Sequence, residues 1–182
     1  MRTLNIALTG HRPPQLDGYI LDSPFYKQMK THLVNIILDY TEQYDEIYCH
    51  TGMALGADMI WGLAIIEAKG QTKTPIHLVA HIPYLQQPSV WCASKDVNTW
   101  HHLRKCATKE FVYGNLCDFP LSLRKEKAKQ FLNKRNQGMI SNADILIGIY
   151  NGTSFGGTKN ALQYARKKNI PTHIYAPDMF RV

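Results

Sequence analysis

Two glycine-containing segments hold the residues of this 182-residue chain that are best suited to chemistry. Residues 156–160, Gly-Gly-Thr-Lys-Asn, follow the apolar run 145–150, and residues 51–58 follow the strand-like run 46–50. Each combination is typical of a strand that turns through glycines into a helix. Unpaired backbone N–H groups and the helix dipole favour an anion at such a turn. We therefore expect a phosphate-bearing, nucleotide-sized ligand at these two turns.

The small and polar residues of the turns have individual roles in this interpretation. Four glycines would let the backbone approach phosphate or ribose, although ordinary turn geometry also explains them. They are Gly52, Gly56, Gly156 and Gly157. Thr158 would cap the following helix or bind phosphate with its hydroxyl. Asn160 would bind a sugar or the edge of a base, and the alternative is a solvated residue of the first helical turn.

Charged and aromatic side chains near the turns add candidate contacts. Arg12 and Arg135 carry planar guanidinium groups suited to phosphate oxygens, with surface ion pairs as the alternative. His11 is a candidate for hydrogen bonding or acid/base chemistry, and Asp58 for a catalytic carboxylate or a helix-dipole partner. Stacking on a base, or the more common core packing, is expected of Tyr84, Trp91 and Phe155.

Cysteine spacing and composition exclude several classes of protein. The cysteines at 49, 92, 106 and 117 form no C-x-x-C pair, which argues against a disulfide framework or a zinc ribbon. Cys92, His101, His102 and Cys106 match no common zinc spacing, so no metal site is expected. No apolar run approaches the roughly 20 residues of a membrane span, and the N-terminus lacks a signal-peptide core. We expect a cytoplasmic protein without a membrane partner.

The formal net charge of +7 is unevenly distributed along the chain. Nine Lys or Arg but only three acidic residues lie between positions 104 and 135. A solvated helix face is the common explanation of such a run, and a nucleic-acid surface is the alternative.

The elements that must position these residues alternate along the chain. Strands are predicted at 4–8, 47–50, 76–80, 111–113, 145–150 and 172–175, and helices at 24–44, 57–69, 95–107, 123–141 and 159–168. Ser23 is the expected N-cap of the first helix, and Gly70 the expected C′ residue of the second. The pattern predicts one α/β domain over residues 1–182, Rossmann-like, with a mainly parallel sheet covered by helices on both faces. Ligands of such sheets bind beyond the carboxyl ends of the strands.

Four motifs in one order closely resemble the YpsA-type branch of the SLOG superfamily. They are A-L-T-G-H-R-P from Ala7 to Pro13, which contains Gly10, G-M-A-L-G-A-D from Gly52 to Asp58, Arg135-Asn136, and G-G-T-K-N from Gly156 to Asn160. The resemblance covers nearly the whole chain. It implies a Rossmann-like fold and a nucleotide-derived ligand such as ADP-ribose, NAD or a signalling nucleotide. Gly10 and Asn136 thereby join the candidate ligand-binding residues.

The same resemblance bears on catalysis. The superfamily includes the LOG phosphoribohydrolases, in which G-G-x-G-T-x-x-E supplies a catalytic glutamate and an upstream arginine holds the nucleotide. Arg135 resembles that arginine, whereas Ala161 stands at the glutamate position, and alanine cannot take part in acid/base or nucleophilic chemistry. The first hypothesis is therefore a cytoplasmic sensor or sequestering protein that requires no cofactor.

Two alternatives remain open at this stage. One is a nucleotide N-glycosidic or phosphoribosyl hydrolase that uses Asp58 or His11. The other is a nucleic-acid-binding protein similar to DprA, another member of the superfamily, that uses the basic stretch. The expected partner is a nucleotide-type small molecule. Nucleic acid is the weaker alternative, and a homo-oligomer is compatible with the sequence.

Overall fold

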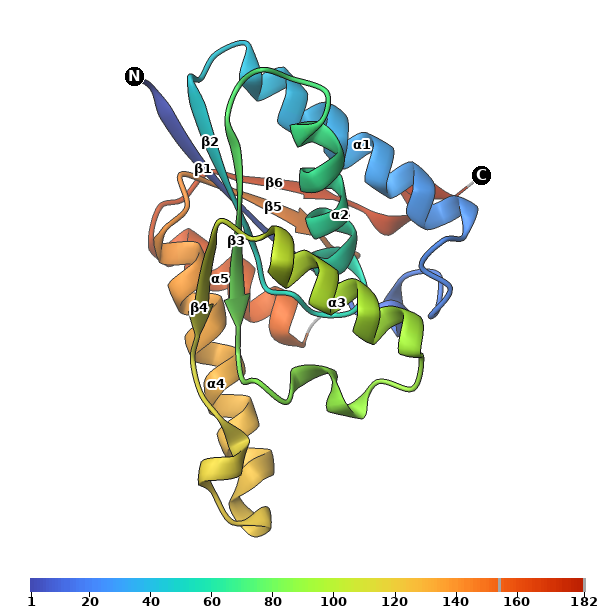
Figure 1. Cartoon of the computed structure of the whole chain (residues 1–182), viewed down its shortest axis with the longest axis vertical. Helices are drawn as coiled ribbons and strands as arrows, with labels where there is room; N and C mark the ends of the chain where they lie inside the picture. Colours follow the sequence, from blue (N-terminus) through green and yellow to red (C-terminus); the bar gives the residue numbers. More distant parts are fainter. Residues whose placement is uncertain (154, 182) are drawn as a thin grey trace.

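Six parallel strands form one sheet in the structure, a computed structural model that describes residues 1–153 and 155–181 (Figure 1). The strand order is β4-β3-β2-β1-β5-β6. The strands are β1 (Thr3–Gly10), β2 (Glu46–Thr51), β3 (Ile76–Ile82), β4 (Lys109–Val112), β5 (Ile145–Ile149) and β6 (Thr172–Tyr175). All five pairings are parallel, which confirms the predicted fold class.

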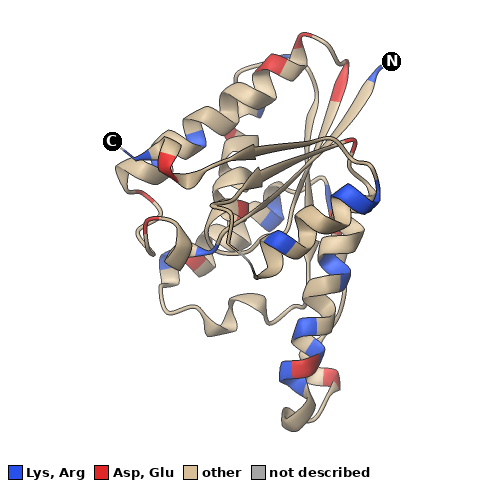
Figure 2. Ribbon diagram, turned by 180° about the vertical axis from the view of Figure 1, so that it is seen from behind, with Lys and Arg blue, Asp and Glu red and all other residues tan. Residues whose placement is uncertain are grey.

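Five helices cover the two faces of this sheet. The helices α1 (Pro24–Thr41), α2 (Ala57–Lys69) and α3 (Ser94–Cys106) pack on one face. On the other face lie α4 (Leu121–Ser141) and α5 (Gly157–Lys167), as the view from behind shows (Figure 2). Because the chain extends the sheet from β1 to β4 and then returns to pair β5 with β1, the strand order reverses beside β1. Ligand crevices of open α/β sheets lie at such a reversal point.

Side-chain alternation along β1 explains why the two layers differ. Leu4, Ile6 and Leu8 point into the larger core cluster, which also contains the buried residues of α1 and α2. Ala7 points to the opposite face, where a much smaller cluster packs against α4 and α5. Because fewer apolar side chains fill the face under α4 and α5, polar side chains of the strands can also lie there.

Several element ends differ from those predicted. The first helix ends at Thr41 rather than near Tyr44, and α4 and α5 each begin two residues earlier than expected. Ser23 occupies the N-cap of α1, but its hydroxyl donates to Asp17 at 2.7 Å instead of capping the helix. Gly70 is the C-cap of α2 with a right-handed φ of −78°, so it does not need the freedom of glycine.

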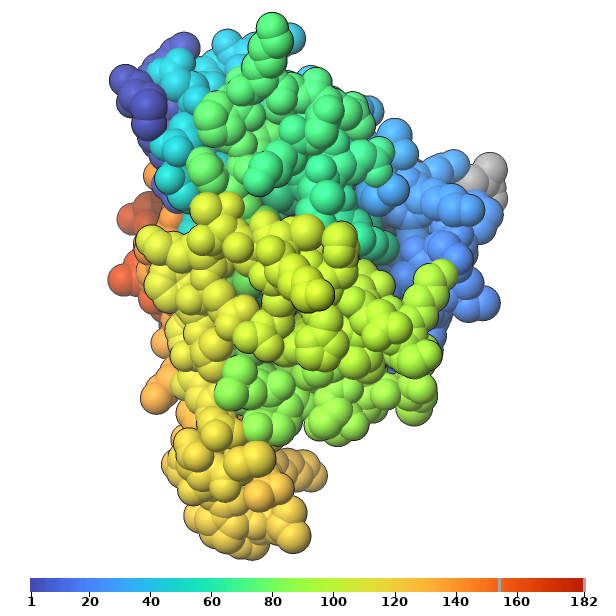
Figure 3. Space-filling view, viewed as in Figure 1, coloured from blue at the N-terminus to red at the C-terminus, as the bar shows by residue number. Residues whose placement is uncertain are grey.

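The first half of α4 extends beyond the carboxyl edge of the sheet (Figures 1 and 3). A short 3₁₀ segment, Leu116–Asp118, leads into it, and Phe119 packs its ring 6.0 Å from that of Phe131 on the helix. The second half of α4 returns over the sheet, where Met139 and Ile140 are buried. In the described part of the chain, no helix is both long and apolar enough to cross a bilayer.

Candidate functional site

A cleft of about 360 Å³ opens where β1 ends, between α4 and the start of α5. Nine of the predicted ligand-binding residues line it: Gly10, Arg12, Asp58, Arg135, Asn136, Gly156, Gly157, Thr158 and Asn160. Thr9, Lys129, Leu132 and Asn133 also line the cleft, although the sequence analysis did not select them. Residues 129, 132, 133 and 136 share one side of α4 by helical spacing. Lys129, Leu132 and Asn133 lie seven, four and three residues before the predicted Asn136. This helical spacing is the sequence signal that could have identified them.

Arg135 and Asp58 form a buried ion pair in this cleft. The Nη1 of Arg135 donates to Oδ2 of Asp58 at 3.0 Å, across a sequence separation of 77 residues. Only 5% of Arg135 and 4% of Asp58 are exposed. Burial lowers the pKa of Arg135, and the carboxylate of Asp58 opposes that shift. Removing either partner would leave an uncompensated buried charge, so Arg135 contributes to folding and is not the surface ion pair considered as the alternative.

The same guanidinium group has unused hydrogen-bonding capacity. The Nε of Arg135 is buried and has no hydrogen-bond partner among residues 1–153 and 155–181. A buried unpaired donor carries a desolvation cost, and a donor on a charged group carries a larger one. Because Arg135 lines the cleft, an anion there could add a second negative charge beside the guanidinium.

The first turn of α5 forms the opposite wall of the cleft. Gly156 is the N-cap residue with a φ of +110°, and as a glycine it has no side chain of its own to cap the helix. Gly156 and Gly157 are exposed, and a Cβ added to either would meet only open space. Thr158 does not cap α5 as expected, because it lies inside the helix as its second residue; it is 8% exposed. The start of α5 thus presents backbone donors to the cleft.

The other three site glycines face protein rather than open space. A Cβ at Gly10 would overlap Cβ of Ala57, and one at Gly52 would overlap the guanidinium of Arg135. Gly56 has a φ of +96°, and a Cβ there would approach the carbonyl oxygen of His11 to 2.6 Å. Gly52 and Gly56 do not line the cleft, so the structure gives them a packing role. The absence of a side chain at position 52 is what admits Arg135.

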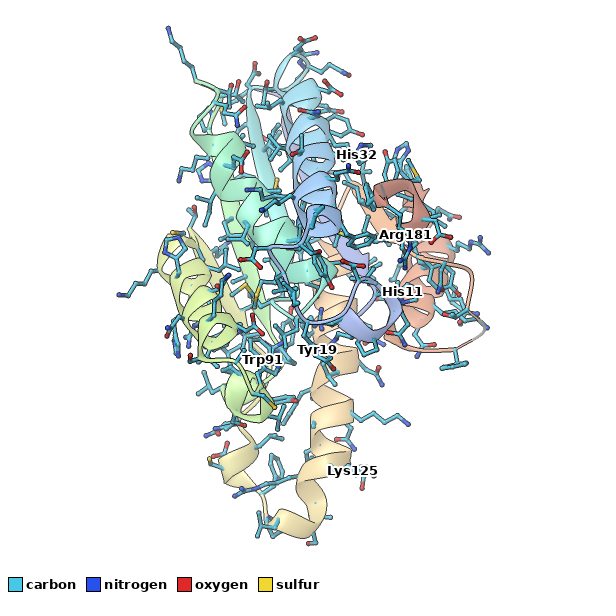
Figure 4. All side chains as sticks on the ribbon, turned by 90° about the vertical axis from the view of Figure 1, so that its right-hand side faces the viewer. His11, Tyr19, His32, Trp91, Lys125 and Arg181 are labelled. Carbon is cyan, nitrogen blue, oxygen red and sulfur yellow. The ribbon has the colours of Figure 1, made fainter. Side chains whose placement is uncertain are left out.

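Three further candidates lie outside the cleft lining. The Nε2 of His11 contacts both Oδ1 of Asn151, at 2.7 Å, and the backbone N–H of Asn151, at 3.1 Å. Burial lowers the pKa of His11, and the Asn151 contact opposes the shift. Tyr84 follows β3, and Trp91 packs against the larger core cluster before α3 (Figure 4). The described residues that line the cleft are all non-aromatic, so the predicted stacking of a base on Tyr84, Trp91 or Phe155 has no aromatic ring among them.

A row of buried polar side chains crosses the sheet beneath α4. Because Oδ1 of Asn5 can only accept, the Nε2 of His50 donates to it, at 3.3 Å. The Nδ1 of His50 then accepts from Nε2 of His81 at 2.9 Å, and Nδ1 of His81 accepts from the Tyr113 hydroxyl at 2.8 Å. At the other end, Asn5 donates to Asp144 at 3.0 Å. Every donor thus has an acceptor only while both histidines are neutral.

Burial accounts for the neutral state of this pair. It lowers the pKa of His50 to about 4 and that of His81 to about 3. For His81, the positive charges of protonated His50 and of Arg135 add to the shift. The row therefore belongs to the same electrostatic environment as the cleft. No local pattern in the sequence indicates this row, because its five residues lie on five separate segments.

Three members of the cysteine and histidine set considered above, His101, His102 and Cys106, lie on α3. The Sγ of Cys106 lies 3.8 Å from Nε2 of His102, one helical turn away. Within the described ranges, no three His, Cys, Asp or Glu side chains come together as metal ligands.

The fold and the cleft define a Rossmann-like α/β protein with a polar cleft at the reversal point of its sheet. The chain is 26% identical over 161 residues to the uncharacterized SPbeta prophage-derived protein YoqJ of Bacillus subtilis strain 168, covering 85% of this chain and 90% of that protein. It is 24% identical over 164 residues to a UPF0398 protein of Bacillus cereus strain B4264, covering 90% and 83% of the two chains. No protein-family model matches the chain. The similarity to YoqJ and UPF0398 proteins thus extends over most of the fold.

Proposed function

We propose that this protein binds a nucleotide-derived small molecule whose phosphate lies between the start of α5 and Arg135. The observation that carries the proposal is one cleft that joins the N-terminus of α5, where a glycine is the N-cap residue, to the buried guanidinium group of Arg135. Helix N-termini and guanidinium groups both favour phosphate oxygens. A ligand phosphate would accept hydrogen bonds from the backbone N–H groups of Gly157 and Thr158 and would lie near the positive charge of Arg135.

Charge and side-chain chemistry of the cleft support this choice. Among the described residues, Arg12, Lys129 and Arg135 line it together with one carboxylate, that of Asp58. Asn133, Asn136 and Asn160 add carboxamides, which can donate to and accept from sugar hydroxyls. The resemblance to YpsA-type SLOG proteins favours ADP-ribose, NAD or a signalling nucleotide as the ligand, and a cytoplasmic sensor or sequestering protein as the role.

The proposal is tested by calorimetric titration with AMP, ADP-ribose and NAD. Arg12 is exposed and has no ion pair among the described residues, so Arg12→Ala should leave folding intact while weakening binding about tenfold or more. Arg166→Ala is the matched control, because Arg166 is exposed on α5 and outside the cleft. If none of the ligands binds, or if both variants behave alike, the proposal fails.

Hydrolysis is the second candidate, and Asp58 is the residue that would carry it. Its carboxylate lies in the cleft, where a sugar would be placed beside the phosphate. However, that carboxylate is already engaged in the buried ion pair with Arg135 and is not free to act on a substrate. We therefore rank binding first.

A further inference from the structure

A second polar groove continues the cleft between α4 and α5. Its volume is about 250 Å³, and it shares Asn133, Asn136 and Asn160 with the cleft. Small-molecule sites typically measure about 300–1,000 Å³, so the cleft alone is near the lower limit. The two spaces together can hold a longer ligand.

Carboxamide side chains dominate the groove. Gln137 and Gln163 join the three shared asparagines, which brings five carboxamides to one groove. None of the five makes a side-chain hydrogen bond within the described part of the chain. A carboxamide both donates and accepts, as do the hydroxyls of a sugar and the edge of a nucleobase. The groove is therefore suited to a neutral group with several hydrogen-bonding atoms.

The residue at position 161 helps to keep this groove open. Ala161 lines the groove and is 1% exposed, packed in the smaller core cluster. A longer side chain there would have to enter either the cluster or the groove. The far end is bounded by Tyr164, whose hydroxyl lies 3.0 Å from that of Ser141, and by Lys167.

The net positive charge of the two helices that flank both spaces favours a ligand with more than one phosphate charge. Helices α4 and α5 contain nine of the 21 Lys and Arg residues but only one of the 14 Asp and Glu residues. The remainder of the chain is consequently close to neutral. Figure 2 shows the positions of Lys and Arg, coloured blue on the ribbon, along these two helices.

We propose that the groove between α4 and α5 is a second subsite, which takes the distal sugar or base of a ligand whose phosphates lie in the cleft. The ligand class is then a dinucleotide or a nucleoside diphosphate joined to a second sugar, rather than a mononucleotide. This inference rests on the proposed function, because the phosphate in the cleft orients the ligand along the groove.

The test compares AMP with ADP-ribose in calorimetric titrations of the wild type and of the double variant Gln137→Ala/Gln163→Ala. Both glutamines are exposed and outside the cleft, so the fold should be unaffected, and a melting curve checks this. The wild type should bind ADP-ribose at least tenfold more tightly than AMP. The double variant should lose about tenfold in affinity for ADP-ribose and less than twofold for AMP, since two hydrogen bonds are removed from one ligand only.

Gln130→Ala is the control, because Gln130 is exposed on α4 but lines neither space. Equal losses for both ligands, or no loss for ADP-ribose, would overturn the second subsite and leave the proposed function standing. Wild-type protein that binds neither ligand would overturn the proposed function and the subsite together. We expect Arg12→Ala to lose AMP binding and the double variant to retain it. This pair of results would show that the cleft binds the phosphate independently of the groove.

Discussion

At the scale of single residues, the site depends on one contact between a glycine and an arginine. Arg135 reaches Asp58 through the space beside Gly52, which a Cβ would occupy. The ion pair joins α4 to α2 past the edge of the sheet. Position 52 thus controls the geometry of the cleft without lining it.

Gly52→Ala should therefore destabilise the protein and weaken ligand binding. Displacing the guanidinium group strains a packed region and disturbs a buried ion pair, which should lower the free energy of unfolding by about 2–3 kcal/mol. Urea denaturation measures this change. Gly157→Ala is the control for stability, since a Cβ there meets open space and alanine favours the helix. Similar stability changes in the two variants would refute the packing role of Gly52.

A second prediction at this scale concerns catalysis. Ala161 occupies the position of the glutamate in the resembled hydrolases and is buried among apolar side chains. Without that carboxylate the transition state of base release lacks a charged partner. We expect no free adenine from AMP after long incubation at high protein concentration, as measured by chromatography. Turnover by the wild type that Asp58→Asn abolishes would instead place hydrolysis before binding.

At the scale of elements, the start of α5 is the part of the fold that the ligand should contact through backbone. Its first N–H groups belong to Gly157 and Thr158, because α5 begins at Gly157. Proline is tolerated at the first helical position and removes one N–H donor. A proline there therefore tests the backbone contact alone.

Gly157→Pro should weaken binding of a phosphate-bearing ligand about tenfold or more, because a hydrogen bond to a charged group is lost. The melting temperature should change little. Ser94→Pro is the matched control at the first position of α3, an exposed site outside the cleft, and should leave affinity unchanged. Calorimetric titration with ADP-ribose gives both affinities. Unchanged binding in Gly157→Pro would exclude that amide as a ligand contact.

The polar row across β1, β2 and β3 leads to a prediction about pH. The pKa values of His50 and His81 are about 4 and 3 when folded, below the ordinary 6.5, so the unfolded chain binds more protons in mildly acidic solution. The two neutral histidines therefore contribute fully to the free energy of unfolding above pH 6.5, and this contribution is lost as the pH falls towards their pKa values in the folded protein. At pH 5 the loss is on the order of 2 kcal/mol for each histidine.

Urea denaturation between pH 7 and pH 5 tests this dependence. The variant His50→Gln/His81→Gln should show a smaller loss of stability over that range than the wild type. His102→Gln is the control, because His102 is exposed on α3. If the double variant keeps the pH dependence of the wild type, the lowered pKa values of His50 and His81 are not its cause.

At the scale of the whole molecule, the positive charge is concentrated on one layer. The cleft, the groove and the projecting half of α4, which includes Lys125, all belong to that layer (Figures 2 and 4). Such a field attracts any polyanion at low salt. It does not by itself select nucleic acid over a small phosphorylated ligand.

Salt dependence separates these two partners. Binding of a single-stranded oligonucleotide, followed by fluorescence anisotropy, should be weak and should disappear near 0.2 M salt, since it depends on phosphate neutralisation alone. Lys125→Ala/Lys127→Ala should weaken it further while leaving ADP-ribose binding unchanged, because neither lysine lines the cleft or the groove. Tight oligonucleotide binding at 0.2 M salt would favour the DprA-like alternative.

The sequence by itself determined the order and type of the elements and the end of the sheet at which the candidate site lies. Periodicities of two and 3.6 are local properties, and glycines after strands mark the carboxyl edge wherever the strands pair. The structure confirmed the fold and placed residues of all four quoted motifs in one cleft. Helix ends were less predictable, because capping depends on neighbours such as Asp17.

Only the tertiary structure decided how these residues meet. The pairing of Arg135 with Asp58, the space that Gly52 leaves, and the row from Asp144 to Tyr113 all join segments distant in sequence. The contacts of Arg135 exist because the chain crosses from β4 to the opposite face before α4, which brings that helix against the carboxyl ends of strands formed much earlier. The polar row exists because the strands that carry it pair side by side. No local pattern encodes that crossing, since it follows from which strands pair and from the hand of their connections.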